Sequence, residues 1–130
     1  MGIPVVTALY GSLHALLNIA LASRVSAIRM RERVALGDGA SKVLTVAVRT
    51  HANNAESVPL ALVLLLLAEL CGGASFWLHV AGGSLLVARI MHAVGMPRPA
   101  PNVFRFVGTA VTWIGIAAIA CWVLWLRRGG

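Results

Sequence analysis

The feature that most limits the fold is a series of four apolar blocks, at roughly residues 3–23, 43–70, 74–95 and 103–126. A transmembrane α-helix needs about 20 such residues, because each residue advances the chain about 1.5 Å and the hydrocarbon core is about 30 Å thick. None of the blocks alternates between apolar and polar residues, so a β-barrel is disfavoured. The sequence therefore predicts an all-α integral membrane protein with four spanning helices.

The connections between the blocks are short and rich in helix breakers. Glycines at 37, 39, 72 and 73 and prolines at 97, 99 and 101 separate helices expected over residues 3–35, 43–70, 74–95 and 103–126. Helices joined this closely must pack as antiparallel neighbours. The chain is 59% hydrophobic and leaves no polar segment of domain length, so we expect residues 1–130 to form a single four-helix bundle.

Basic residues gather beside the first and third connections. The positive-inside rule then places both connections in the cytoplasm and both chain termini outside, although Arg127 and Arg128 oppose this orientation. A net charge of +7 could also indicate nucleic-acid binding, but bases confined to the ends of membrane spans favour topology instead, and we expect no nucleic-acid partner. The basic residues are Arg24, Arg29, Arg31, Arg33, Lys42, Arg89, Arg98 and Arg105, and the nearby acids are Glu32 and Asp38.

Polar side chains interrupt the second block. Arg49, Asn53 and Glu56 are spaced i, i+4, i+7, so on a helix they form one stripe, and His51 lies on the opposite face. A charged stripe in a membrane helix must face other helices, a partner subunit or a water-filled cavity. An Arg49–Glu56 ion pair that only holds helices together would explain the stripe. A site for a zwitterionic ligand would explain the stripe equally, because an arginine binds carboxylates, a glutamate binds ammonium ions and a carboxamide hydrogen-bonds to neutral groups.

Further basic groups at the same depth favour the ligand site. Arg89 and His92 are spaced i, i+3 near the end of the third block, and Arg29 and Arg31 leave the first helix at that level. Excess positive charge in a partly dehydrated crevice attracts an anion. The sequence therefore predicts an anion-binding crevice on the cytoplasmic side.

The second block also carries a recognisable motif. The pattern R-x-H-x-N-x-x-E-x-x-P at residues 49–59, followed by a leucine-rich run, resembles the second helix of the MAPEG proteins, the membrane-associated proteins in eicosanoid and glutathione metabolism. The segment A-R-I-M-H at 88–92 and the P-N turn at 101–102 leading to F-V-G at 106–108 are similar to that family as well. The resemblance covers nearly the whole chain.

This resemblance implies a homotrimer in the membrane lipid that binds glutathione between adjacent subunits near the cytoplasmic side. Arg49, Asn53 and Glu56 would hold the charged ends and backbone of glutathione, and His51 would meet the ligand from the neighbouring subunit. Arg29, or alternatively Arg31, would match the basic residue at the end of the first helix. The expected glutathione-binding residues are Arg29, Arg49, His51, Asn53, Glu56, Arg89 and His92.

The chain also departs from the family pattern. Ser57 and Met96 stand where family enzymes often have tyrosines, and the one tyrosine of the sequence, Tyr10, lies towards the outer end of the first helix. The family arginine that stabilises the glutathione thiolate begins the fourth helix. Alignment on the P-N turn places Val103 there, whereas Arg105 lies two residues later and is the candidate catalytic residue.

Three functions remain open from the sequence. The leading hypothesis is a glutathione-dependent enzyme of transferase or peroxidase type acting on a lipophilic electrophile, because an arginine beside the sulfur favours a nucleophilic thiolate. The alternative is a non-catalytic scaffold that binds a lipid or a protein partner. A small transporter or proton relay is the third, but His14 and His79 are isolated and are expected to hydrogen-bond locally. No His, Cys, Asp and Glu set has the spacing of a metal site, so none is predicted.

Overall fold

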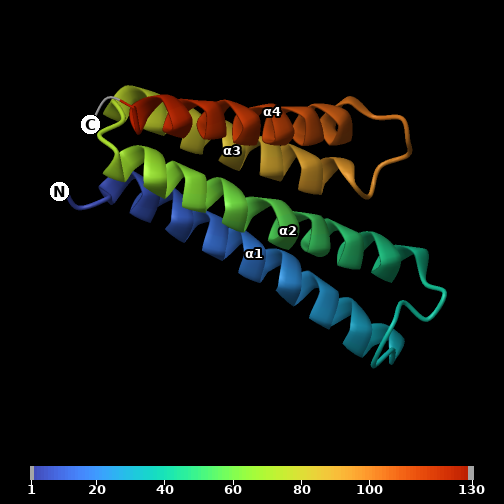
Figure 1. The fold of residues 1–130 in the computed structure, drawn as a ribbon. Helices are drawn as coiled ribbons and strands as arrows, with labels where there is room; N and C mark the ends of the chain where they lie inside the picture. The colour runs from blue at the N-terminus through green and yellow to red at the C-terminus, as the bar shows by residue number, and fades with distance from the viewer. Residues whose placement is uncertain (1, 129–130) are drawn as a thin grey trace.

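The computed structural model describes residues 2–128, which form the helices α1 (Val5–Glu32), α2 (Lys42–Leu70), α3 (Ser75–Gly95) and α4 (Val103–Leu126). The helices alternate in direction, so both ends of the chain and the α2–α3 turn lie at one end of the bundle and the other two connections lie at the opposite end (Figure 1). Each helix is long and apolar enough to cross a membrane. The predicted all-α four-helix antiparallel bundle is confirmed.

The first connection begins earlier than its glycines suggest. α1 ends at Glu32, not near residue 35, because Arg33 takes a left-handed conformation with φ 56° and donates its backbone N–H to the carbonyl of Arg29. Such a residue closes the last turn of a helix by satisfying a free carbonyl group. α2 then begins after Ser41, whose hydroxyl accepts the Leu44 backbone N–H at 3.2 Å.

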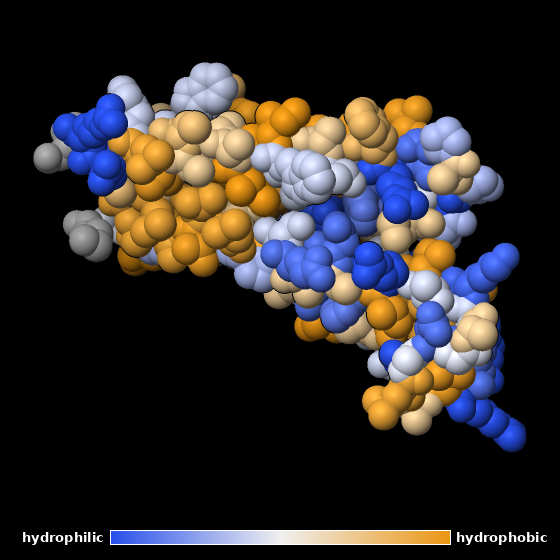
Figure 2. Space-filling model, turned by 45° about the vertical axis from the view of Figure 1, so that its right-hand side comes forward, coloured by the Kyte–Doolittle hydropathy of each residue, from blue (hydrophilic) through white to orange (hydrophobic). Residues whose placement is uncertain are grey.

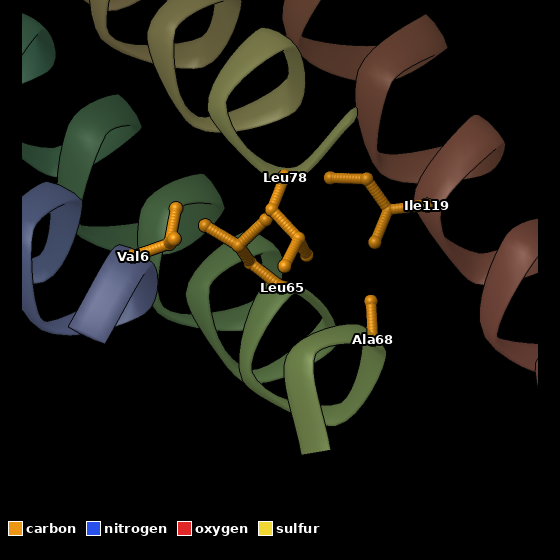
Figure 3. Close-up of a cluster of buried hydrophobic side chains, with 5 residues drawn as sticks. All are labelled: Val6, Leu65, Ala68, Leu78 and Ile119. Atoms are coloured by element: carbon orange, nitrogen blue, oxygen red, sulfur yellow. The ribbon is translucent and has the colours of Figure 1, made fainter. Parts of the chain in front are cut away.

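The two helix pairs separate towards the end that carries the α1–α2 and α3–α4 connections (Figure 1). At the other end, one buried cluster draws on all four helices and consists of Val6, Leu65, Ala68, Leu78 and Ile119 (Figure 3). Near the α1–α2 connection, the buried cluster of Ile28, Leu44 and Ala47 comes from α1 and α2 alone. The bundle is therefore joined at one end and divided into α1–α2 and α3–α4 pairs at the other.

Close backbone contact holds α3 against α4. A Cβ atom on Gly108 would lie 2.6 Å from the Ala88 carbonyl oxygen and 2.7 Å from the His92 backbone nitrogen, so glycine alone lets the two helices approach this far. Asn102 adds a second link, because its Oδ1 accepts the Arg105 backbone N–H at 2.9 Å and its Nδ2 donates to the Gly95 carbonyl at 3.0 Å. These contacts set where α4 begins relative to the end of α3.

The outer surface of the bundle is apolar over much of its length. Leu16, Trp113 and Ile114 are each about two-thirds exposed, which suits side chains that meet lipid tails. On the face shown in Figure 2, hydrophobic residues cover most of the half near the chain termini, apart from a hydrophilic group at its very end. Hydrophilic residues also gather towards the separated ends of the two helix pairs. Polar chemistry is thus concentrated where the bundle opens.

Candidate functional site

A small polar pocket of about 100 Å³ lies between α2, α3 and α4, where the two helix pairs separate. Hydrophilic side chains lie between the α1–α2 pair and the α3–α4 pair in this part of the molecule (Figure 2). The pocket is lined by Arg49, Ala52, Asn53, Glu56, His92, Met96 and Arg105. Five of the site residues predicted from the sequence therefore meet in one place: Arg49, Asn53, Glu56, His92 and Arg105.

The α2 stripe forms one wall of this pocket. Arg49 and Glu56 are both exposed, and Asn53 lies half-buried between them. Within residues 2–128 the ion pair that forms is Arg31–Glu32, at 3.2 Å, so Arg49 and Glu56 do not neutralise each other. The stripe keeps a cation and an anion free to meet a ligand.

Arg89 lies behind the pocket wall and not in it. Its side chain is 2% exposed, and it donates from Nη2 to Asn53 Oδ1 at 2.8 Å and from Nε to Asn54 Oδ1 at 3.2 Å. Nη2 also lies 3.4 Å from His92 Nδ1. Because Asn53 and His92 both line the pocket, Arg89 orients two of its walls at once.

The site residues predicted from the sequence do not include the other end of this network. Asn54 donates from Nδ2 to Asn18 Oδ1 at 3.3 Å, which extends the hydrogen bonds from α3 through α2 to α1. Both asparagines lie inside apolar blocks, and a carboxamide there must find polar partners. That cost could have predicted a role for Asn18 and Asn54, but the i, i+4, i+7 stripe lies on the other face of α2.

Arg105 reaches the pocket from the first turn of α4. Its backbone is anchored by the Asn102 cap, and its exposed side chain lines the same pocket as the α2 stripe. Val103, the other alignment for the family arginine, is 70% exposed and does not line the pocket. The geometry thus favours Arg105 as the helix-four arginine of the site.

The remaining predicted residues lie outside the pocket of the single chain. Arg29 donates from Nη1 to the Gly37 carbonyl at 2.8 Å, so it closes the first connection, and Arg31 pairs with Glu32. His51 is half-buried and is absent from the pocket lining. None of these three side chains lines the polar pocket of the single chain.

The chain matches a known family over most of its length. Residues 7–125 match the MAPEG family. The inner membrane protein YecN of Escherichia coli strain K12 is 37% identical over 122 residues, which cover 92% of this chain and 91% of the relative. YecN of strain O6:H1 matches with the same identity and coverage. The chain belongs to the MAPEG family and is a multi-pass integral membrane protein.

Proposed function

We propose that this protein is a glutathione-dependent membrane enzyme, of transferase or peroxidase type, that acts on a lipophilic electrophile. One observation carries the proposal: Arg105 of α4 lines the same pocket as Arg49, Asn53 and Glu56 of α2. Family membership agrees with a membrane enzyme of this kind but does not specify the reaction.

The chemistry of the pocket fits glutathione. Arg49 and Arg105 offer charged donors for a carboxylate or a thiolate, Glu56 offers an acceptor for an ammonium group, and Asn53 can bind a peptide group. Arg89 fixes the Asn53 carboxamide, so this part of the site is ordered before a ligand arrives.

The pocket volume supports a site shared between subunits. About 100 Å³ in one chain is less than a tripeptide needs, since pockets for ligands of that size usually measure about 300–1,000 Å³. We propose a homotrimer in which His51 and Arg29 of a neighbouring subunit complete the site. The mass of the purified protein, determined by light scattering with the detergent contribution subtracted, tests the trimer directly.

Arg105 is the proposed catalytic residue. A guanidinium beside the glutathione sulfur favours the thiolate, and the thiol proton leaves to solvent. In the transferase reaction the sulfur electron pair forms the new C–S bond while the leaving group of the electrophile departs with the electrons of the bond that breaks. The apolar outer surface of the bundle would let a lipophilic second substrate approach from the membrane.

The direct test is the ultraviolet absorbance of a thiolate when glutathione is added to the detergent-purified protein. We expect a thiolate signal with the native chain and its loss in Arg105→Ala, because the alanine removes the charge that stabilises the anion. Arg98→Ala is the matched control, since Arg98 is an exposed arginine stacked on the Phe104 ring at 4.5 Å and is absent from this pocket.

A non-catalytic binding scaffold is the second candidate, and one feature favours it. Met96 lines the pocket where family enzymes often carry a tyrosine, so a hydroxyl that could assist the thiol is missing from that wall. Glutathione that binds without a thiolate signal and without conjugation of a model electrophile would support the scaffold. No glutathione binding at all, together with unchanged stability of Arg49→Ala, would rule out the proposed glutathione site.

A further inference from the structure

His14 is a buried histidine without a hydrogen-bond partner. Its side chain is 1% exposed in the middle of α1, and neither ring nitrogen is hydrogen-bonded. The expectation that both isolated histidines bond locally is confirmed for His79, whose Nδ1 lies 3.2 Å from the Tyr10 hydroxyl, but it is wrong for His14. An unpaired polar ring in a membrane interior is costly and calls for a binding partner.

The ring lines a cavity between α1 and α2. This cavity measures about 270 Å³, and its walls include Asn18, Val58, Pro59 and Leu62. It shares no lining residue with the pocket of Arg49 and Arg105. A single water needs only about 10–15 Å³ by a comparable measure, so the space admits an organic molecule.

Other polar groups face the same space as His14. Asn18 accepts from Asn54 through its Oδ1, which leaves its Nδ2 group to donate elsewhere. Pro59 has no backbone N–H, so the carbonyl of Ala55 lacks the helical donor it would otherwise receive. Ala55, Pro59 and Asn18 all line the cavity, which therefore offers both donors and acceptors beside an apolar wall.

The lining also limits the charge of a ligand. No charged side chain lines this cavity, and an anion would be costly to place in an uncharged site inside a membrane. A hydroxyl group is neutral and can both donate and accept a hydrogen bond. We propose that this cavity binds the hydroxyl end of an uncharged lipophilic alcohol or phenol, with His14 as its principal hydrogen-bonding partner.

This site is independent of the proposed glutathione chemistry and can be tested without it. The probe is a medium-chain alcohol with a photoreactive diazirine on its tail, applied to the full-length protein in detergent. We expect labelling of the α1 and α2 peptides around the cavity, and we expect excess 1-octanol to suppress it. A second probe with the same tail but no hydroxyl should label these peptides weakly.

His14→Phe should reduce labelling by the alcohol probe about ten-fold, the factor that corresponds to one lost hydrogen bond. His14→Gln, which keeps a donor and an acceptor, should restore most of the labelling. His79→Phe makes the same change at a histidine outside the cavity and should leave labelling unaltered. Removing an unpaired polar group should also leave the fold intact, which a thermal melt of His14→Phe checks.

Leu62→Trp is a second test of the proposal, and it does not alter the histidine. The larger ring should fill the apolar part of the cavity and block labelling while His14 remains. Equal labelling of the native chain, His14→Phe and Leu62→Trp would overturn the proposal. Equal labelling by the probe without a hydroxyl would do the same, because the cavity would then hold only apolar tails or water.

Discussion

At the scale of single residues, Arg89 organises the polar interior. Its guanidinium donates to the side-chain oxygens of Asn53 and Asn54, which project from neighbouring positions of α2 towards α3. A planar guanidinium can serve two acceptors at fixed angles, whereas an ammonium group is a single point of charge on a flexible stem. The position therefore requires the shape of arginine as well as its charge.

Arg89→Lys tests this requirement. The substitution keeps the charge but leaves either the buried Asn54 oxygen or the half-buried Asn53 oxygen without its donor. We expect the free energy of unfolding to fall by about 1–3 kcal/mol and glutathione affinity to fall about ten-fold, because Asn53 is no longer held in the pocket wall. Thermal melts and calorimetric titration with glutathione measure the two effects.

The control for this prediction is Arg24→Lys, at an exposed arginine of α1 that lies outside the pocket. It should change neither quantity. Unaltered glutathione affinity in Arg89→Lys would show that Arg89 does not position the pocket wall.

At the scale of helices, two kinds of contact replace the hydrophobic effect, which cannot drive association between helices in lipid. One is close packing at glycine, seen where Gly108 of α4 meets the backbone of α3. The other is capping between helices: the Glu69 carboxylate of α2 accepts the backbone N–H of Val6 at 2.9 Å and of Thr7 at 2.7 Å. The first contact acts at the open end of the bundle and the second at the joined end.

Gly108→Ala should separate α3 from α4 at the pocket. The added methyl group would collide with the Ala88 carbonyl and the backbone and Cβ of His92, and backbone cannot move aside as a side chain can. We expect the free energy of unfolding to fall by about 1–3 kcal/mol, as for other overpacked contacts. The measurement is denaturant-induced unfolding in detergent, followed by circular dichroism.

Gly115→Ala, in the same helix, supplies the matched comparison. A Cβ at Gly115 would meet no atom within 4 Å. Stability should therefore stay the same or rise by up to about 1 kcal/mol, since alanine favours a helix more than glycine does. An equal loss of stability in both variants would refute the close-packing explanation.

At the scale of the whole molecule, the up-and-down arrangement places the α1–α2 and α3–α4 connections at one end (Figure 1). The polar pocket is lined by residues of α2, α3 and α4. The basic residues near these connections predict that this end faces the cytoplasm. The arrangement of the helices is the same for either orientation, so only an experiment in cells decides the side.

Single cysteines, introduced after Cys71 and Cys121 are replaced by serine, can report the orientation. Ala35→Cys and Ala100→Cys probe the exposed first and third connections, and Ala74→Cys probes the exposed α2–α3 turn. We expect a membrane-impermeant maleimide to label Ala74→Cys in intact cells and the other two only after permeabilisation. The reverse pattern would show that the basic connections lie outside and that the positive-inside rule fails for this chain.

The local features of this protein could be predicted from its sequence alone. Block length and composition were enough for four membrane helices, because the thickness of the bilayer sets how many apolar residues a helix needs. The shared face of Arg49, Asn53 and Glu56 also followed from the sequence, because helix geometry relates residues only a few positions apart.

The packing of the four helices in three dimensions sets which side chains come together. Arg105 lies in the pocket of the α2 stripe, Arg89 lies behind the wall of that pocket, and His14 is unpaired beside a separate cavity. These placements depend on how far one helix is shifted and rotated against the next. That register is set by contacts between distant residues, such as Gly108 against His92, and no pattern within a single helix encodes it.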